Sequence, residues 1–552
     1  MNLTRISVIA SIAAAAAAIH ATSTRPAYSQ SKPDLVVLIA VDQFSASLFD
    51  QWRGRFKSGL KRLIDEGIVY SNAYQSHGLT ETCAGHSTML TGKHPRGTGM
   101  VANEWFDTKT GDQVYCVEAP AFSVASNPKR HVGPTNLLAT TLGDWMKDQQ
   151  PTSRVVAVSG KDRASITMAG HRGDGVFWYE DNFGFTTYLA AGEDAAAKLA
   201  PLAGLNVKIK AEMASPPLWT YSEESCRAFE ADYQFGARTW HSKLPPENPS
   251  GATVRPVHLI DPYTVEAARI LVDHFQLGRR GVTDLLAVSL SATDFVGHGY
   301  GTQGPEMCDH LYRLDAQIGT FLTFLDGLGP RVLVVMTGDH GGSDFVERLA
   351  LRGFANARRI DSKAFLTAVN DELKSKFSLT ADPLVTPDFT QYYAVDGKKL
   401  ALGEPLRTNV IEAALAILNG RQEVEVAFSL RELLSHKEKR SAQSDYSLRD
   451  RYAQSVMDGR SGDIIVAFKS GIATGSAPPT GLLMEHSGPY RNDTAVPIVF
   501  WWQGMKGQTR ILPVDTTMIA PTLANIIDAK PPADLDGTCF DLGFPGAPKC
   551  TR

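Results

Sequence analysis

Four short apolar runs, each followed by charged residues, constrain the fold of this chain more than any other feature of its sequence. They occupy residues 35–41, 154–159, 285–291 and 332–336. Their apolar residues are continuous rather than alternating, which is typical of strands buried on both faces. Segments with apolar residues at helical spacing lie between the runs. This alternation predicts an α/β fold, with a central, mostly parallel sheet that is flanked by helices on both faces.

Charged residues follow each of these predicted strands. They are Asp42, Lys161 with Arg163, Asp294, and Asp339. Parallel strands that alternate with helices end at one common edge of the sheet, and open α/β sheets bind their ligands at that edge. We therefore expect these side chains to lie close together in one site.

Histidine residues accompany two of these aspartates. His298 follows Asp294 by four positions, so one helical turn would place both side chains on one face. His340 follows Asp339 directly, and glycine neighbours allow two adjacent side chains to bend toward a shared site. With His486 in a later loop, the acidic and histidine residues suffice for two metal sites with three protein ligands each. Mixed Asp and His ligation suits Zn²⁺, which keeps an open position in catalytic sites.

Thr82 is a candidate nucleophile in the segment 80–103, which is dense in Gly, Pro, Ser and Thr. This composition predicts a turn, where backbone amides and a side chain can converge on an anion. A threonine in such a turn more often caps a helix or bonds its own backbone. A nearby pair of metal ions would let its hydroxyl act as an alkoxide near neutral pH. The interpretation of Thr82 therefore depends on the predicted metal ligands.

Composition excludes some classes of protein and bounds the domain organisation. The formal net charge is only -4 and no long basic run occurs, so we expect no nucleic-acid-binding surface. A chain of 552 residues with 43% hydrophobic residues can bury a large core. Regular periodicity breaks down at about 168–262 and 358–460, which predicts two insertions into one catalytic domain over residues 30–552. Strands are expected again at 464–468 and 496–500.

The first 29 residues have the pattern of a secretory signal peptide. Arg5 supplies the positive charge, residues 6–19 form an Ala-rich apolar core, and residues 27–29 offer a cleavage site. That core is too short to span a bilayer. A buried N-terminal helix is the alternative interpretation. We expect a periplasmic or secreted protein, with no membrane span after removal of the signal.

Six cysteines are compatible with an oxidising compartment, and no CxxC pair indicates a zinc ribbon or a redox motif. Fifteen pairings are possible. The pairing that we favour joins Cys539 to Cys550, because it would close a short loop in a Gly- and Pro-rich tail.

One ordered set of residues resembles a known family. The set comprises Asp42, Thr82 with His86 four residues later, Asn103, Lys161-x-Arg163, Asp294-x-x-x-His298, Asp339-His340 and His486. It resembles the alkaline phosphatase superfamily, and most closely the bacterial periplasmic alkaline phosphatases with a threonine nucleophile, the phosphate-irrepressible type also found in sphingomonads. The resemblance extends from about residue 35 to the Pro-rich tail.

The resemblance implies a division of roles among these residues. One zinc ion would be held by Asp294, His298 and His486. The second would be held by Asp42, Asp339, His340 and the Thr82 oxygen. Asn103, Lys161 and Arg163 would contact the phosphoryl oxygens, and Thr82 would become a phosphothreonine. The implied cofactors are thus two Zn²⁺ per subunit, and an additional structural Ca²⁺ or Mg²⁺ stays open.

The pair Lys161 and Arg163 also bears on the substrate. An ammonium and a guanidinium match the additional charge of a monoester dianion, whereas a diester places a second substituent there. We therefore expect small phosphate monoesters as substrates. A nucleotide pyrophosphatase or phosphodiesterase of the same superfamily is the alternative, although the resemblance implies that those enzymes lack this pair. A noncatalytic, metal-binding secreted protein is a third possibility. A monomer is the expected oligomeric state.

Overall fold

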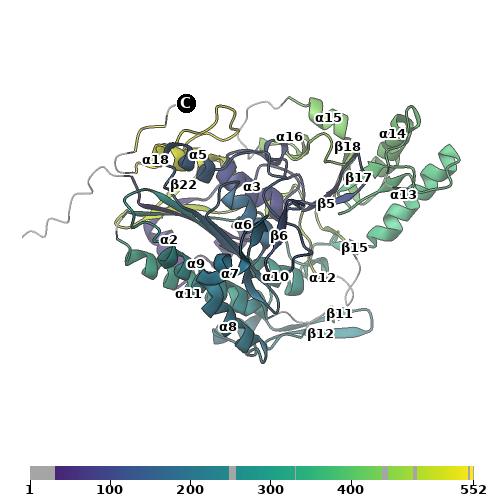
Figure 1. The fold of residues 1–552 in the computed structure, drawn as a ribbon. Helices are drawn as coiled ribbons and strands as arrows, with labels where there is room; N and C mark the ends of the chain where they lie inside the picture. The colour runs from purple at the N-terminus through teal and green to yellow at the C-terminus, as the bar shows by residue number, and fades with distance from the viewer. Residues whose placement is uncertain are drawn as a thin grey trace, which may run out of the picture.

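The computed structural model describes residues 32–247, 256–329, 331–398, 400–437, 445–475, 482–544 and 547–550. A nine-stranded sheet in the order β22-β2-β21-β14-β1-β13-β7-β8-β9 forms the centre (Figure 1). Strands β14, β1, β13, β7 and β8 are neighbours and run parallel. Strand β21 is antiparallel to β14, and β9 is antiparallel to β8. The predicted fold class is confirmed. The bounds of the nine strands are β1 Leu35–Val41, β2 Ile68–Tyr70, β7 Val155–Ser159, β8 Gly175–Glu180, β9 Gly184–Thr186, β13 Asp284–Leu290, β14 Val332–Thr337, β21 Ile498–Trp502 and β22 Gln508–Arg510.

Strand β1 explains why the apolar runs are continuous. Its side chains alternate between two hydrophobic cores, one on each face of the sheet. On one face the core includes residues of α2 (Gly59–Glu66), α9 (Ile260–His274) and α11 (Pro305–Asp326). On the other face it includes residues of α3 (Thr82–Thr91), α5 (Leu142–Gln149), α6 (Asp162–Ala169) and α18 (Ile519–Ile527). All seven residues of β1 are buried, so polar residues are excluded from the strand.

The register of the sheet places the carboxyl ends of four strands together. Val41 of β1 lies opposite Leu290 of β13, and Ala40 lies opposite Thr337 of β14. Ser289 of β13 lies opposite Ser159 of β7. The loops that follow these strands therefore start at the same edge, as parallel pairing requires.

The first predicted insertion begins later than 168. Strands β8 and β9 belong to the central sheet, and β8 pairs in parallel with β7. Aromatic residues of β8 (GVFWYE) obscured the strand pattern, but Phe177, Trp178 and Tyr179 are all buried. The segments outside the sheet are β10 (Tyr188–Ala190), α7 (Ala195–Leu199), α8 (Ala203–Met213) and the hairpin of β11 (Ala231–Phe235) with β12 (Arg238–Ser242).

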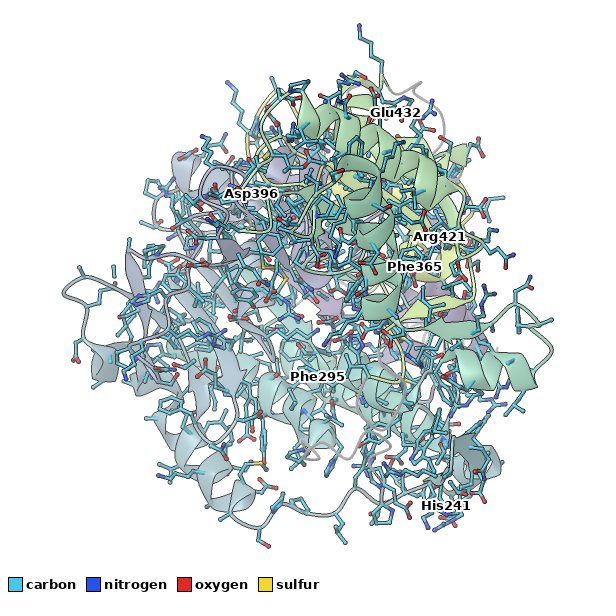
Figure 2. The ribbon with its side chains drawn as sticks, turned by 90° about the vertical axis from the view of Figure 1, so that its right-hand side faces the viewer. His241, Phe295, Phe365, Asp396, Arg421 and Glu432 are labelled. Atoms are coloured by element: carbon cyan, nitrogen blue, oxygen red, sulfur yellow. A yellow bond between two sulfur atoms is a disulfide. The ribbon has the colours of Figure 1, made fainter. Side chains whose placement is uncertain are left out.

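The second insertion forms a separate layer with its own sheet. Strands β16 (Leu384–Val385), β17 (Gln391–Ala394), β19 (Ile464–Phe468) and β18 (Val424–Ser429) pair in that order. They share a hydrophobic core with α13 (Ser362–Phe377) and α14 (Leu406–Asn419). Strand β19 therefore belongs to this insertion and not to the central sheet. The insertion projects from the right of Figure 1, and in the turned view its Phe365 and Arg421 lie above Phe295 (Figure 2).

Shorter elements complete the described chain. The helices are α1 Ala46–Trp52, α4 Pro95–Thr98, α10 Ala292–Tyr300, α12 Val346–Leu351, α15 Leu430–Ser435, α16 Leu448–Ala453 and α17 Arg491–Thr494. The strands are β3 Ala73–Tyr74, β4 Glu104–Phe106, β5 Gln113–Tyr115, β6 Phe122–Val124, β15 Arg358–Ile360, β20 Ile472–Thr474 and β23 Val514–Asp515.

The predicted disulfide between Cys539 and Cys550 is confirmed. Two further disulfides join Cys83 to Cys116 and Cys226 to Cys308. The predicted signal peptide lies outside the described residues. Among the residues that are described, no helix combines the length and the apolar character needed to cross a membrane.

Candidate active site

The carboxyl edge of the central sheet carries the residues that the sequence analysis singled out. Asp42 directly follows β1, and Lys161 is the N-cap residue of α6 after β7. Asp294 and His298 both lie in α10, which follows β13. Asp339 and His340 follow β14. Because these four strands are neighbours, the side chains converge on one site, as expected.

His486 reaches this site from a distant loop. The loop is attached to α10, because the Leu483 N–H donates to the His298 carbonyl oxygen at 3.0 Å. The ring of His486 is held by its Nδ1 atom, which lies 2.8 Å from the carbonyl oxygen of Thr80. The Nε2 atom therefore faces Asp294 and lies 3.6 Å from its Oδ1. This contact could not be inferred from the spacing of the residues in the chain.

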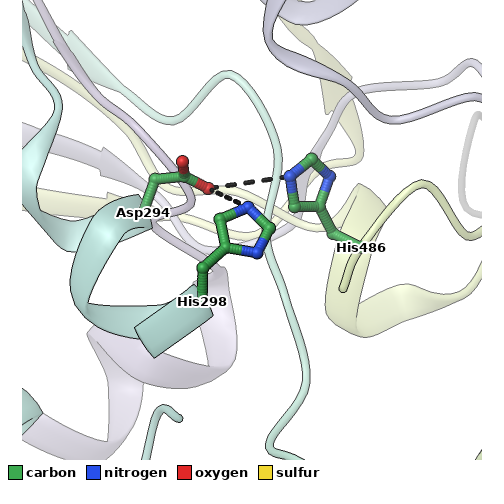
Figure 3. Close-up of side chains that lie close together, drawn as sticks. All are labelled: Asp294, His298 and His486. Carbon is green, nitrogen blue, oxygen red and sulfur yellow. Dashed lines mark ion pairs between the residues drawn. The ribbon is translucent and has the colours of Figure 1, made fainter. Parts of the chain in front are cut away.

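Asp294, His298 and His486 form the first group of metal-binding type (Figure 3). The Nε2 atom of His298 lies 3.2 Å from Asp294 Oδ1. Its Nδ1 atom lies 2.6 Å from the Met484 carbonyl oxygen. A carbonyl at Nδ1 fixes the tautomer in which Nε2 carries the lone pair, as in histidines that bind metals. Both histidines thus present Nε2 to the same carboxylate oxygen.

Asp42, Asp339 and His340 form the second group, and all three are fully buried. His340 Nε2 lies 3.6 Å from Asp42 Oδ1 and 3.4 Å from Asp339 Oδ2. Lys161 Nζ lies 2.7 Å from Asp42 Oδ2, and His86 Nδ1 lies 3.0 Å from Asp339 Oδ2. Among the described residues, Asp42 Oδ1 and His340 Nε2 have no hydrogen-bond partner. Burying such atoms without a partner is costly. A divalent cation would satisfy both of them, so the residues present fit a metal ion.

The charges of the site also fit a bound metal ion. Burial and the neighbouring Asp339 raise the pKa of Asp42 to about 6. Although burial acts in the opposite sense, His298 and Lys161 hold the pKa of Asp294 well below its usual range. Burial also opposes protonation of His298, but Asp294 raises the pKa of that ring to about 9. Buried carboxylates that repel one another are stabilised by cations.

Thr82 is the first residue of α3, with Glu81 as the N-cap, so the predicted turn is wrong. The small residues Gly, Ser and Thr disguised the helix in the sequence. Gly85 is required there, because a Cβ atom would overlap the backbone carbonyl of Asp339. The helix therefore packs directly on the second metal-binding group. Its N-terminus places the positive partial charge of the helix beside Thr82.

Two cations flank the Thr82 hydroxyl. Lys161 Nζ and Arg163 Nη2 each lie 3.4 Å from Thr82 Oγ1. Lys161 Nζ also lies 2.7 Å from Asp42 Oδ2 and 2.6 Å from Asp294 Oδ2. The ammonium group therefore touches one carboxylate from each metal-binding group.

Asn103 is held to the residues on either side of Thr82. Its Oδ1 accepts from the Cys83 N–H at 3.0 Å, and its own N–H donates to Glu81 Oε2 at 2.6 Å. The Cys116 N–H donates to the Asn103 carbonyl at 2.9 Å, and Cys116 is bonded covalently to Cys83. Asn103 and Thr82 thus form one rigid unit.

Two residues that the sequence analysis did not single out support the site. Gln43 donates from Nε2 to Asp294 Oδ1 at 2.9 Å and from its backbone N–H to Asp339 Oδ1 at 3.0 Å. Its φ of 62° is in the left-handed region, an unusual conformation for glutamine. Tyr115 lies 3.4 Å from Arg163 Nη1 and donates to Asp162 at 2.7 Å. No local pattern marks either residue.

A parallel α/β sheet with two metal-binding groups beside one hydroxyl and two cations defines a metal-dependent hydrolase of the alkaline phosphatase superfamily. Comparison with protein families narrows this class. The family described as type I phosphodiesterase / nucleotide pyrophosphatase matches residues 36–480, and the chain belongs to it.

Individual relatives extend this relationship over nearly the whole chain. The chain is 34% identical over 520 residues to alkaline phosphatase PhoK of Sphingomonas sp, which covers 92% of this chain and 91% of the relative. It is 35% identical over 530 residues to alkaline phosphatase PhoD of Zymomonas mobilis, and the match covers 94% of this chain and 89% of the relative. The crystal structure of wild-type alkaline phosphatase PafA matches with a TM-score of 0.79 at 25% identity, covering 92% of this chain and 98% of that one. The predicted superfamily is confirmed.

Proposed function

We propose that this chain is an alkaline phosphatase that hydrolyses small phosphate monoesters through a phosphothreonine at Thr82. The observation that carries the proposal is the position of Lys161 and Arg163, each 3.4 Å from Thr82 Oγ1. A monoester dianion presents nonbridging charge that an ammonium and a guanidinium can match together. The names of the relatives PhoK and PhoD support the same activity.

The proposed cofactors are two Zn²⁺ ions. Asp294, His298 and His486 would hold one ion, and Asp42, Asp339 and His340 would hold the other together with Thr82. The mixture of carboxylate and imidazole donors favours zinc over calcium or magnesium. When bound, the ions would lower the pKa of the attacking hydroxyl and stabilise the leaving oxygen.

Side chains of the protein bind and orient the substrate and carry out the nucleophilic attack. Lys161, Arg163 and Asn103 hold the nonbridging oxygens and orient phosphorus toward Thr82. Thr82 Oγ1 then bonds to phosphorus, the bond from phosphorus to the alcohol oxygen breaks, and the alcohol leaves with a proton. Water cleaves the resulting phosphothreonine, which releases inorganic phosphate and restores the hydroxyl. The rigid link between Thr82 and Asn103 keeps nucleophile and phosphoryl group aligned.

A phosphodiesterase is the second candidate, because the matching family is described by that activity. The two activities are separated by measuring kcat/KM for an aryl phosphate and for its methyl diester on one zinc-loaded preparation. We expect the monoester to be much the better substrate. A preference for the diester would reverse the assignment, and hydrolysis of neither would favour a noncatalytic, metal-binding protein.

We also propose that residues 30–552 form one catalytic domain and act as a monomer outside the cytoplasm. The three disulfides of the described residues support an oxidising compartment. The signal peptide over residues 1–29 belongs to this proposal, which N-terminal sequencing of exported protein would test. Light scattering and elemental analysis would test the monomer and the number of zinc ions, and would reveal any additional Ca²⁺ or Mg²⁺.

A further inference from the structure

A cleft of about 480 Å³ opens directly beside the two phosphate-binding cations. Lys161 and Arg163 line it together with Phe295 and residues of the β8 edge, among them Glu180. Its volume is in the range of roughly 300–1,000 Å³ that is typical of small-molecule sites. We call this cleft the ring cleft. None of the proposed catalytic steps requires it.

Phe295 links the ring cleft to the reacting groups. It follows Asp294 in α10, and its ring is partly buried against the hydrophobic core. Lys161 Nζ lies 5.2 Å from the centre of that ring and 3.4 Å from Thr82 Oγ1. An aromatic surface therefore adjoins the place where a phosphoryl group would be held. In Figure 2 the ring lies below Phe365 and Arg421 of the second insertion.

The charges of the ring cleft disfavour a second anion. Arg130 is paired with Asp162 and, at 2.6 Å, with Glu180. A phosphoryl dianion would occupy Lys161 and Arg163. Arg130 would then be the remaining cation among the lining residues, against Asp162, Glu180 and Asp181. A neutral group is accommodated there more readily than a second phosphate or a carboxylate.

We propose that the ring cleft binds the alcohol side of the substrate and that Phe295 packs against an aromatic ring in it. The preferred substrates are accordingly monoesters of neutral aromatic alcohols. This inference rests on the proposed phosphomonoesterase activity and names its substrate class. Packing of two aromatic rings contributes more than the burial of their area alone.

A different role for Phe295 has to be separated from this one. Its ring could act solely through Lys161, since a cation beside an aromatic face is stabilised. In that case the loss of the ring would weaken the hydrolysis of every monoester by the same factor. A selective loss for aromatic esters is expected only if the ring contacts the substrate.

The test compares benzyl phosphate with cyclohexylmethyl phosphate and methyl phosphate. All three release primary alcohols, and the first two differ mainly in the aromatic character of the ring. For Phe295→Ala and Phe295→Leu we expect kcat/KM for benzyl phosphate to fall roughly tenfold more than for methyl phosphate. Phe295→Tyr should restore the preference for benzyl over cyclohexylmethyl phosphate. The parent should hydrolyse 4-carboxybenzyl phosphate less efficiently than benzyl phosphate, because the cleft disfavours a second anion.

The controls identify each kind of failure. Phe354→Ala removes a phenylalanine that is 62% exposed and should leave the substrate preference unchanged. If Phe295→Leu has a normal zinc content and loses the same factor in kcat/KM on all three esters, the ring cleft does not bind the alcohol side of the substrate, and the proposal is wrong. If the parent hydrolyses no monoester, calorimetric binding of benzylphosphonate and methylphosphonate still tests the cleft. If Phe295→Leu then weakens the binding of benzylphosphonate and not that of methylphosphonate, the cleft binds an aromatic ring although the proposed function is wrong. If the variant binds both phosphonates as the parent does, both proposals are wrong.

Discussion

Lys161 and Asp294 form a buried ion pair with 2.6 Å between Nζ and Oδ2. The pair joins a residue of the first metal-binding group to a cation that lies beside Thr82. A metal ion bound by Asp294 would compete with Lys161 for the carboxylate. The ammonium would then be available for a phosphoryl oxygen, so metal loading and substrate binding are coupled in this geometry.

Removal of the metal ions should abolish activity, and Zn²⁺ should restore it. Without them the Thr82 hydroxyl stays protonated near neutral pH, because Lys161 and Arg163 alone do not lower its pKa enough. Mg²⁺ alone should not restore activity, because it prefers oxygen ligands. Initial rates after chelation, with residual metal checked by elemental analysis, measure the effect. Full activity in protein free of metal would contradict the proposed mechanism.

Thr82→Ala should lose several orders of magnitude in kcat, because no other residue is proposed as the nucleophile. The six carboxylate and histidine side chains of the two metal-binding groups remain, so bound zinc should persist. Thr82→Ser retains a hydroxyl and should keep part of the activity. Mass spectrometry of an acid-quenched digest should find phosphate on Thr82 in the parent. Phosphate on a different residue would rule out this role.

The double variant Lys161→Ala/Arg163→Ala should lose monoesterase activity far more than diesterase activity. The two cations match charge that a diester does not carry. Hydrogen bonds to charged groups contribute about 1.5–3 kcal/mol each, so we expect roughly tenfold or more per residue in kcat/KM for a monoester. Lys208→Ala/Arg279→Ala removes two cations of exposed ion pairs and is the matched control. Equal losses on both substrates would assign the pair a structural role.

Gly85→Ala should weaken the second metal-binding group. An added Cβ atom would overlap the Asp339 carbonyl, so α3 and the loop after β14 must separate. Overpacking of this kind costs about 1–3 kcal/mol in the free energy of unfolding. Zinc content and kcat should fall together. The control is Gly204→Ala in α8, where nothing lies within 4 Å of the added atom and where alanine favours the helix.

Because of His310, the free energy of unfolding should fall at acid pH. Burial lowers the pKa of this histidine from 6.5 to about 4, and its Nε2 lies 2.8 Å from Thr293 Oγ1. The unfolded chain therefore binds a proton before the folded protein does, so stability is complete above pH 6.5 and falls as the pH falls toward 4. Between neutral pH and pH 5 the loss should be about 2 kcal/mol from this residue.

Chemical denaturation of chelated protein at both pH values measures the contribution of His310. His310→Gln should have a smaller pH dependence than the parent. His241→Gln, which alters an exposed histidine paired with Asp232, should leave the pH dependence nearly unchanged. An unchanged slope for His310→Gln would show that the pKa of this ring is the same in the folded and the unfolded protein.

Much of the fold and the site could be predicted, because the relevant information is local. The apolar runs are continuous because both faces of β1 are packed, and this burial is visible as composition. Asp42 and Asp339 could be assigned to one edge because parallel strands share their direction. Asp294 and His298 could be paired because a helical turn relates positions four apart.

The tertiary structure decided what depends on distant partners. His486 meets Asp294 only because its loop is attached to α10 and to Thr80. Strand β19 has the same apolar composition as the central strands, yet it pairs within the insertion. Composition also suggested a turn at Thr82, where packing against Asp339 selects a helix. By itself the sequence determined which residues end which strands, because periodicity and burial are local properties. The folded chain decided which loops meet there, because that depends on long-range packing that no local spacing encodes.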